Sequence, residues 1–540
     1  MKKLIRLLYE VHRWLGIALA VFMLMWFFSG LVIMYSPTIT QTRSGQLAHA
    51  ETLSPEVGWL SLGEAWERSA QQRQTLAKPK DAKPDEVVGI IDARLVRSAG
   101  NPLWLIEDSQ GQRFALSALD GSLHKTSIEE ALTIADYWHG RSESAGLAQA
   151  QYLATLDKTI LLRNQDALSP FHQIAIGDDG GQVLISEKTG EVLHASNTVS
   201  RAFYWAGNWL HLFKPLEALG YGKIRNDVQL WSGLLATVAT LTGLIIGWLR
   251  WRPGIGGRPT YSQGRTQPYR EFWFKWHFWT GLIGGTVMLF WAGSGFLDTN
   301  PNKIFSQTNP NRQEIMRYMG QALPETMMAW QPVLPLNLAM AVGGEDVVEL
   351  SWKHLDHAAV LIAHTRDGQR LPQGVDGAKS RFDEASLLAA LSRVIAKTTA
   401  ASPVLLQDYD DYYYARQDQS QVEKPLPVWR VTLADDENTQ WYIDPQDGKL
   451  LSKVDRRARI FRWAYSALHH WDFGWLKYRP LWDVWMLVWV SFGLVLTVSS
   501  LVIGWRRLKQ TFGFKKTRAR KQTPRKVRYA MQGAAKEQQL

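Results

Sequence analysis

The sequence predicts a mainly α-helical membrane protein, with four transmembrane helices and α+β domains outside the membrane. Three observations predict this fold class: four long uncharged apolar runs, strand and turn signals in the segments between them, and residues that recur at a fixed offset. The chain of 540 residues is also longer than one hydrophobic core usually organises. Membrane helices and water-soluble domains should therefore alternate along the chain.

Four runs without a charged residue are long enough to cross a bilayer. They have 22, 22, 20 and 22 residues and extend over Trp14–Tyr35, Val228–Leu249, Phe278–Leu297 and Val484–Trp505. At about 1.5 Å per residue, each run can span a hydrocarbon core of roughly 30 Å. A buried soluble helix rarely stays uncharged for so long, so we interpret the runs as membrane helices. The first run is too long for a cleaved signal and should be retained.

Basic residues mark one side of the membrane. Four of them precede the first run, and six lie between the second and third runs, namely Arg250, Arg252, Arg258, Arg265, Arg270 and Lys275. A further eleven, with no acid among them, follow the fourth run between positions 506 and 528. Positive charge of this kind indicates the cytoplasmic side, so the net charge of +11 reflects orientation and not nucleic-acid binding. The basic tail is predicted to be a solvated anchor against anionic lipid.

These signals divide the chain into eight segments. They are a first membrane helix (1–36), a first extracytoplasmic region (37–200), an amphipathic segment with the second helix (201–250), a cytoplasmic linker (251–275), a third helix (276–298), a second extracytoplasmic region (299–457), an amphipathic segment with the fourth helix (458–506) and a basic tail (507–540). We expect a multi-pass protein of a bacterial inner membrane. Both termini should be cytoplasmic, with two large domains in the periplasm.

The two halves of the chain carry the same residues at matching positions. Around the first and third runs, His12, Trp14, Gly16, Trp26, Ser29 and Gly30 match His277, Trp279, Gly281, Trp291, Ser294 and Gly295. Before the second and fourth runs, Arg201, Phe203, Trp205, Ala206, Leu210 and His211 match Arg459, Phe461, Trp463, Ala464, Leu468 and His469. Chance is a poor explanation for so many ungapped identities. We therefore predict two tandem repeats, related by a pseudo-two-fold axis along the membrane normal.

Strand, turn and helix signals fill both extracytoplasmic regions. Alternating apolar runs stand beside four turns that are typical of hairpins, namely Asp120-Gly121, Thr189-Gly190, Asp367-Gly368 and Asp447-Gly448. Helical stretches are predicted at Ser61–Ser69 and Glu384–Ile395. Each region is therefore expected to form an α+β domain of its own, or two small ones.

Four histidines stand at the ends of the predicted membrane helices. His12 and His277 lie at the cytoplasmic ends of equivalent runs, whereas His211 and His469 lie on the opposite side. Neutral imidazole is the usual axial ligand of a b-type haem held between helices, and two rings must converge on one iron. A single histidine at a membrane edge is more often interfacial, but the matched set favours two haem sites. His470 is either a further ligand or a neighbour of His469.

Other residues leave alternatives open. Met23 or Met288 could replace a histidine as one axial ligand. The remaining histidines considered are predicted to be ordinary surface residues of the soluble domains, namely His139, His172, His354 and His357.

Several functions are excluded or made less favourable by what the sequence lacks. The absence of cysteine excludes disulfides, thiolate zinc sites, iron–sulfur clusters, a covalent c-type haem and a catalytic thiol. No nucleotide-binding, hydrolase or zinc-protease motif stands in a convincing context, so the chain has no nicotinamide or flavin module of its own. The four runs contain no charged residue, which argues against proton-coupled transport.

Several of these residues resemble the PepSY-associated transmembrane family. They are the opening Val11-His12-Arg13-Trp14-Leu15-Gly16, Leu210-His211, Leu468-His469-His470 and the turns at Thr189-Gly190 and Asp447-Gly448. The resemblance covers nearly all of the chain except the basic tail. It implies a bacterial inner-membrane protein with periplasmic PepSY domains, often linked to iron acquisition. Some members look like haem-containing ferric-siderophore reductases.

The resemblance implies that His12 and His277 serve a cytoplasm-side haem b, and that His211 and His469 serve a periplasm-side one. The leading hypothesis is thus a di-haem electron conduit that reduces a ferric siderophore, or another iron chelate, in the periplasm. Family members fused to a flavodoxin- or ferredoxin-reductase-like module have an internal donor, which this chain lacks. Its donor would be a cytoplasmic carrier or a quinol. The alternatives are a non-enzymatic PepSY binding or regulatory protein and an iron-chelate permease.

Overall fold

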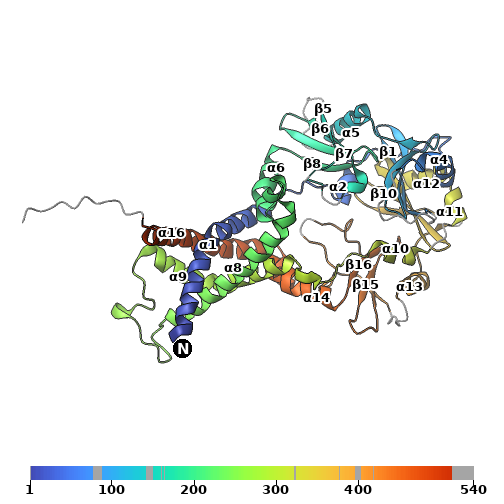
Figure 1. The fold of residues 1–540 in the computed structure, drawn as a ribbon. Helices are drawn as coiled ribbons and strands as arrows, with labels where there is room; N and C mark the ends of the chain where they lie inside the picture. Colours follow the sequence, from blue (N-terminus) through green and yellow to red (C-terminus); the bar gives the residue numbers. More distant parts are fainter. Residues whose placement is uncertain are drawn as a thin grey trace, which may run out of the picture.

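The computed structural model consists of a helical bundle at one end and β-sheets at the other (Figure 1). It describes residues 2–76, 88–140, 150–159, 161–162, 165–320, 324–375, 378–395, 403–416 and 419–513. Most of the predicted basic tail, from residue 514 onward, lies outside the described residues. The predicted class is confirmed: four helices suited to a membrane are combined with an α+β soluble part.

Four helices in the described part of the chain have the length and composition to span a membrane. They are α1 (Lys2–Met34), α8 (Gly222–Arg250), α9 (Phe272–Asp298) and α16 (Leu481–Thr511). Each helix contacts two others, so that α1, α8, α9 and α16 form a closed ring. Each is longer than its predicted apolar run, because the helix continues through the charged residues that flank the run.

Glycines bring the helices of the bundle close together. A Cβ atom on Gly233 of α8 would lie 3.2 Å from Cα of Phe296, and one on Gly493 of α16 would overlap the ring of Phe27. Apolar lipid gives helices no hydrophobic reason to associate, so close backbone packing of this kind has to hold them.

Strands from both soluble regions build one large sheet. The first region supplies β1 (Ile90–Ser98), β2 (Asn101–Asp108), β3 (Arg113–Ser117) and β4 (Leu123–His124). The second supplies β9 (Val347–Leu355), β10 (Ala358–Thr365), β11 (Arg370–Pro372) and β12 (Ala378–Lys379). The order is β11-β10-β9-β1-β2-β3-β4, and β12 pairs with β10. The expectation of a separate domain for each region was therefore wrong, because β1 and β9 pair directly.

The join between the two regions is antiparallel and packs a common core. Arg94 of β1 stands opposite Ser351 of β9, and Leu95 stands opposite Leu350. Trp104 and Trp352 meet edge to face with ring centroids 4.5 Å apart, and both rings are fully buried. Helices α3 (Leu62–Arg68), α11 (Glu325–Ala329) and α12 (Val333–Gly343) add apolar side chains to the same core.

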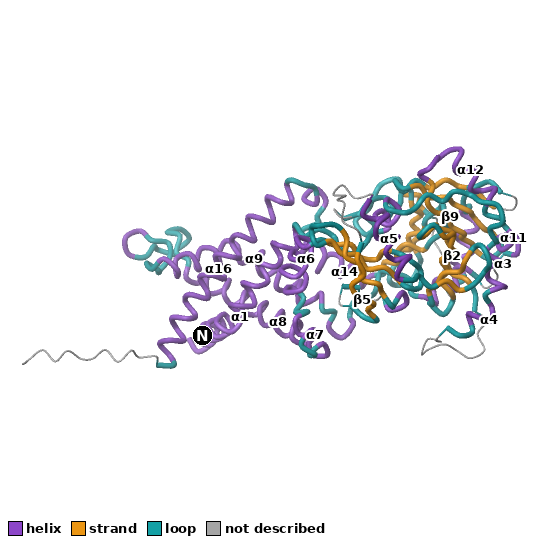
Figure 2. The backbone as a smooth tube through the Cα atoms, turned by 90° about the horizontal axis from the view of Figure 1, so that it is seen from above, coloured by secondary structure: helices purple, strands orange, loops and turns teal. Residues whose placement is uncertain are grey.

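Two four-stranded sheets lie beside this large sheet (Figures 1 and 2). The first has β5 (Gln151–Leu156), β6 (Phe171–Ile176), β7 (Gly181–Ser186) and β8 (Val192–Ser196), covered by α5 (Ile128–Gly140). The second has β13 (Val404–Leu406), β14 (Val428–Thr432), β15 (Gln440–Ile443) and β16 (Leu450–Val454), covered by α13 (Glu384–Ser392).

The predicted hairpins and helical stretches are confirmed. The four turns join β3 to β4, β7 to β8, β10 to β11 and β15 to β16, and the glycine of each has a positive φ of 70–84°. This left-handed backbone conformation is the reason for glycine at these positions. Helix α3 begins after Ser61, whose side chain caps it, and α13 begins at Glu384 as predicted.

Three of the four histidines expected at the surface are buried. His139, His172 and His354 are at most 8% exposed, whereas the side chain of His357 is 81% exposed. His172 lies on β6, where its ring nitrogens are 2.9 Å from the hydroxyl of Thr155 and 2.9 Å from the carbonyl of Thr126. Two polar partners satisfy the ring inside the domain, and a local sequence pattern does not reveal such partners.

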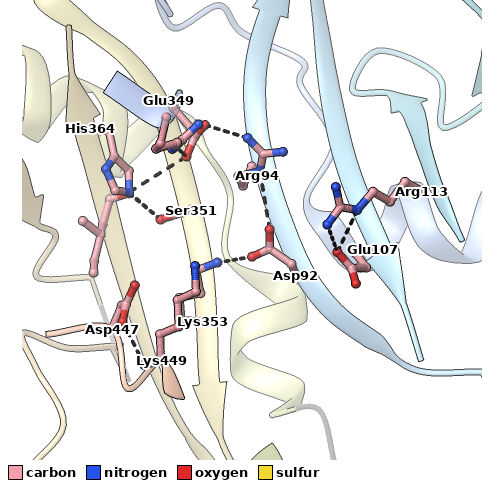
Figure 3. Close-up of polar contacts among 12 residues, drawn as sticks. Asp92, Arg94, Glu107, Arg113, Glu349, Ser351, Lys353, His364, Asp447 and Lys449 are labelled. Atoms are coloured by element: carbon pink, nitrogen blue, oxygen red, sulfur yellow. Dashed lines mark hydrogen bonds and ion pairs between the residues drawn. The ribbon is translucent and has the colours of Figure 1, made fainter. Parts of the chain in front are cut away.

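Charged side chains cross the join between β1 and β9 (Figure 3). Glu349 of β9 is 2% exposed; it pairs with Arg43 of α2 (Arg43–Ala48) and, at 3.2 Å, with Arg94 of β1. Arg94 also pairs with Glu191 at 2.8 Å. Burial alone would raise the pKa of Glu349, but Arg43 and Arg94 outweigh it and lower the pKa to about 2. The cluster therefore stays ionised and ties the two regions together.

The Glu349 cluster gives the first prediction. We expect Glu349→Gln to destabilise the soluble part by about 3–5 kcal/mol, because it leaves two arginines partly buried without their shared counter-charge. The measurement is guanidinium unfolding of the detergent-purified chain, followed by tryptophan fluorescence. The control is Glu56→Gln, which breaks an ion pair with Arg97. The side chain of Glu56 is 56% exposed, so its loss should lower the free energy of unfolding by about 1 kcal/mol or less. Equal midpoints for the two variants would contradict the role given to the cluster.

Candidate functional site

His211 and His469, here called the sheet-side pair, follow unusual backbone in both halves. A π-helix precedes each of them, at Trp205–Trp209 and at Arg462–Ala467. The residue two places after each histidine has a positive φ, 52° at Phe213 and 55° at Trp471. π-Helices are rare and often occur at functional sites, and a left-handed aromatic residue costs about 1–3 kcal/mol. The chain therefore accepts the same local strain twice to place an imidazole.

The two rings of the sheet-side pair face each other with matching support. Their centroids are 6.3 Å apart. The hydroxyl of Ser29 on α1 lies 3.0 Å from Nδ1 of His211, and the hydroxyl of Ser294 on α9 lies 3.0 Å from Nδ1 of His469. The indole N–H of Trp26 donates to the carbonyl of His211 at 3.1 Å. Trp291 donates in the same way to the carbonyl of His469 at 2.9 Å.

The hydrogen bonds of Ser29 determine the tautomer of His211. Ser29 donates its single hydroxyl proton to the carbonyl of Met25 at 2.6 Å. Its oxygen can then only accept from Nδ1, so Nδ1 of His211 carries the ring proton. The other nitrogen, Nε2, keeps its lone pair, and this ring is thus prepared to bind an electron-pair acceptor through Nε2. Ser294 lies 3.0 Å from Nδ1 of His469 and 3.2 Å from the carbonyl of Trp291.

A cavity of about 450 Å³ opens between the sheet-side rings and the bundle. This volume lies in the range of ligand-binding pockets, about 300–1,000 Å³. Small residues keep it open, since a Cβ on Gly30 or Gly295 would lie 3.7 or 3.6 Å from the ring of His211 or His469. Its apolar wall includes Met23, Trp26, Phe27, Met288, Trp291 and Met486. The predicted alternative ligands Met23 and Met288 therefore line this same cavity.

His12 of α1 and His277 of α9, here called the far-side pair, also face each other. Their ring centroids are 6.2 Å apart. Nδ1 of His12 lies 2.9 Å from the carbonyl of Ala239 on α8, so this nitrogen must donate. Nδ1 of His277 lies 3.3 and 3.2 Å from the hydroxyls of Ser499 and Ser500 on α16. Both serines donate to the carbonyl of Leu496, so Nδ1 of His277 again carries the proton.

The spacing of both pairs suits one metal ion between two imidazoles. A metal–nitrogen bond of about 2.0–2.1 Å, with the ring radius of about 1 Å added on each side, puts the two centroids about 6 Å apart. Ser29 lies 17 positions after His12 on α1, which corresponds to about 26 Å along the helix. Among the described residues, no group of three or more His, Asp or Glu side chains could hold a metal ion.

The structure pairs the four predicted histidines in the way that the sequence predicts. It also places His469 and His470 in different surroundings. Ser294 contacts His469, whereas the ring of His470 lies beside those of Tyr465 and His469, with centroids 5.3 and 5.4 Å away. In the sequence, Ser29 and Ser294 were identified only as residues that recur in both halves, and Ser499 was not identified. The sequence did offer one signal for these serines: Ser29 recurs in the second half together with the histidine that it contacts.

Fold and site define a four-helix membrane protein with a histidine pair near each end of its bundle and an α+β part outside it. Residues 9–353 match the family model of the PepSY-associated TM region. The match covers more than half of the chain, and the chain belongs to this family. It includes His12, His211 and His277 and ends within β9. No curated protein shows significant similarity to the chain.

Contacts around His12 give a second prediction. A Cβ atom on Gly243 of α8 would lie 2.6 Å from Cε1 of His12, so Gly243→Ala must displace that ring from Ala239. We expect a loss of about 1–3 kcal/mol, seen as a lower Tm by circular dichroism in detergent.

The control for Gly243→Ala is Gly16→Ala, the same change on the neighbouring helix α1. An added Cβ there has no heavy atom within 4 Å, so we expect an unchanged or slightly higher Tm. Equal Tm values for the two variants would show that His12 is not held tightly against α8.

Proposed function

We propose that the chain is an inner-membrane b-type haem protein that moves electrons across the bilayer and reduces ferric chelates, such as ferric siderophores, in the periplasm. The observation that carries this proposal is the pairing of four imidazoles into two sites, with ring centroids 6.2–6.3 Å apart in each. In this proposal the termini are cytoplasmic and the sheets periplasmic.

Charge balance favours haem over a bare metal ion. The four imidazoles are neutral ligands, and the sheet-side cavity has mainly apolar walls. A bare dication or trication there would have only one carboxylate in the cavity wall, that of Asp298, as counter-charge, and an under-compensated charge in a low-dielectric site is costly. A porphyrin brings two negative charges of its own, needs only two axial ligands, and supplies an iron that alternates between the ferric and ferrous states. The donor set and the cavity therefore fit haem b at the sheet-side site.

We further propose that the two halves are related by a pseudo-two-fold axis along the membrane normal. Strands β9 and β10 begin and end 257 positions after β1 and β2. In the join, Arg94 pairs with Ser351, which is its own equivalent at that offset. The same offset converts the pair Ala93–Trp352 into the pair Leu95–Leu350. The axis would pass between Arg94 and Ser351 and between the rings of both histidine pairs.

The two pairs would divide the crossing into shorter steps. They are separated by about 26 Å of α1, compared with a hydrocarbon core of roughly 30 Å. The far-side pair would receive electrons from a cytoplasmic carrier or a quinol, and the sheet-side pair would pass them outward. Reduction would release the iron, because the oxygen donors of siderophores hold the harder ferric ion better than the ferrous ion.

A visible absorption spectrum is the third prediction and the direct test. We expect a Soret band in the detergent-purified chain and sharp α and β bands after dithionite reduction, as low-spin haem with two axial imidazoles gives. His12→Ala and His211→Ala should each retain about half of the haem per protein. The control is His357→Ala, which removes an exposed imidazole and should leave the spectrum unchanged. Folded native protein from haem-replete cells without a Soret band would contradict the proposal and favour a binding or regulatory protein.

Electron transfer across the bilayer is the fourth prediction. Proteoliposomes loaded with dithionite and supplied with external ferric citrate should produce ferrous iron outside, measured with a ferrous-specific dye. The rate should fall at least about tenfold in His211→Ala, because one haem site is lost. Protein-free vesicles control for leakage. Uptake of the chelate into vesicles without reductant would instead support an iron-chelate permease.

A further inference from the structure

In the first half, a side-chain bridge spans the segment that carries the sheet-side histidine. Nζ of Lys214 donates to the hydroxyl of Tyr204 at 2.7 Å and lies 4.8 Å from the centroid of the tyrosine ring. Both residues are at most 8% exposed. Tyr204 ends α6 (Thr198–Tyr204) directly before the π-helix, and Lys214 directly follows the left-handed Phe213. The bridge therefore encloses the π-helix, His211 and the strained residue.

The second half has a bridge between the same two positions. At the repeat offset of 258, Tyr204 corresponds to Arg462, and Lys214 corresponds to Asp472. The guanidinium of Arg462 donates to a carboxylate oxygen of Asp472 at 2.8 Å and to its backbone carbonyl at 2.9 Å. Both side chains are 11% exposed. Asp472 directly follows the left-handed Trp471, as Lys214 follows Phe213.

The two bridges agree in position but differ in chemistry. In the first half the donor comes after the histidine, whereas in the second half it comes before the histidine. Both residues of the pair have changed between the halves, and a direct hydrogen bond is present in each. This indicates that each half requires the contact and not a particular residue. A left-handed aromatic residue persists only where surrounding contacts over-determine it, and each bridge supplies such a contact beside one.

Contacts in the first half connect the bridge to the imidazole. The backbone N–H of Lys214 donates to the carbonyl of Trp209 in the π-helix at 3.0 Å, so both its backbone and its side chain are held. Phe213 packs edge to face against Trp26 with ring centroids 5.6 Å apart. Trp26 in turn donates to the carbonyl of His211. A change at the strained turn is therefore transmitted to the backbone of the histidine.

We propose that Lys214 positions His211, and that Arg462 with Asp472 positions His469. Each bridge fixes the turn that follows its histidine and so holds the ring toward the opposite imidazole. This inference rests on the proposed function, in which both rings bind one haem iron. These are positioning residues, because they act through the backbone of the histidine and not on the iron.

The fifth prediction is that Lys214→Met allows the reduced protein to bind carbon monoxide. The change removes the donor and keeps a side chain of similar length. A haem iron with two imidazole ligands has no free position for carbon monoxide, so the native chain should not bind it. Release of His211 would free one position, and up to about half of the haem should then bind, because the far-side site is unaffected. The measurement is the Soret difference spectrum of the dithionite-reduced full chain.

Amide hydrogen exchange tests the turn itself and needs no haem. The N–H groups of Leu212, Phe213 and Lys214 donate to carbonyls of the preceding turn. We expect them to exchange at least about tenfold faster in Lys214→Met. Lys214→Arg keeps a donor for the hydroxyl of Tyr204 and should restore native behaviour in both measurements. The matched control is Lys223→Met, the same change at an exposed position of α8, which should behave as the native chain.

The bridge of the second half is tested with Arg462→Met. It should bind carbon monoxide as Lys214→Met does, because His469 is then released. The control is Arg457→Met at an exposed position of α14 (Arg456–Phe461), which should not bind. Native-like spectra of both bridge variants under carbon monoxide would overturn the inference, even with a lower Tm, because the bridges would then support the fold without positioning the imidazoles.

Two further outcomes are distinguishable. If Lys214→Met fails to fold, Tyr204→Phe decides, because it removes only the accepting hydroxyl: carbon monoxide binding supports the inference, and its absence opposes it. Absence of haem in the native chain would contradict the proposed function, and it would be seen before any variant was made. Faster exchange in Lys214→Met would then still support the role of the bridge in the turn, and native exchange would overturn that role as well.

Discussion

The antiparallel pairing of β1 with β9 is the contact on which the rest of the molecule depends. Each histidine pair takes one ring from each half, so neither pair exists unless the halves are held in register. Outside the bundle that register is set by strand hydrogen bonds and by the Arg43–Glu349–Arg94 cluster. A shift of the β1–β9 register by one residue would turn the buried side chains of one strand to the wrong face, so the join admits one alignment.

Local patterns were sufficient to predict the membrane helices and the hairpins. A run of 20–22 uncharged residues has few other interpretations, and Asp-Gly or Thr-Gly beside an alternating run encodes its own turn. The shared sheet was not predictable in this way, because β1 and β9 are more than 240 residues apart and no local sequence pattern specifies which strand pairs with which. His172 shows the same limit, since its partners Thr155 and Thr126 come from other elements.

The histidine pairs were predictable because the chain contains two copies of each signal. The repeat predicted that His469, and not His470, is the site residue, and the contact of Ser294 with His469 agrees with that choice. The tautomer was not predictable, because it depends on where Ser29, Ser499 and Ser500 direct their protons. Asp298 and Tyr465, which line the sheet-side cavity, escaped notice for the opposite reason: they have no repeated counterpart, and a single polar residue near a membrane gives no signal in one sequence.

The paired imidazoles follow the repeat, whereas the wall of the sheet-side cavity departs from it. Equivalent imidazoles provide neutral ligands without placing an acid or a base among the apolar helices, where an unpaired charge would be costly. In the proposed function, an electron entering the sheet-side cavity would add one negative charge to a site with mainly apolar walls. The second half supplies Asp298, Tyr465 and His470 to the wall of that cavity, and the first half supplies Asn208 and Gln229. Polar side chains beside such a site lower the cost of an added charge. Both halves therefore bring polarity to the cavity, although they do so with residues that are not equivalent in the repeat.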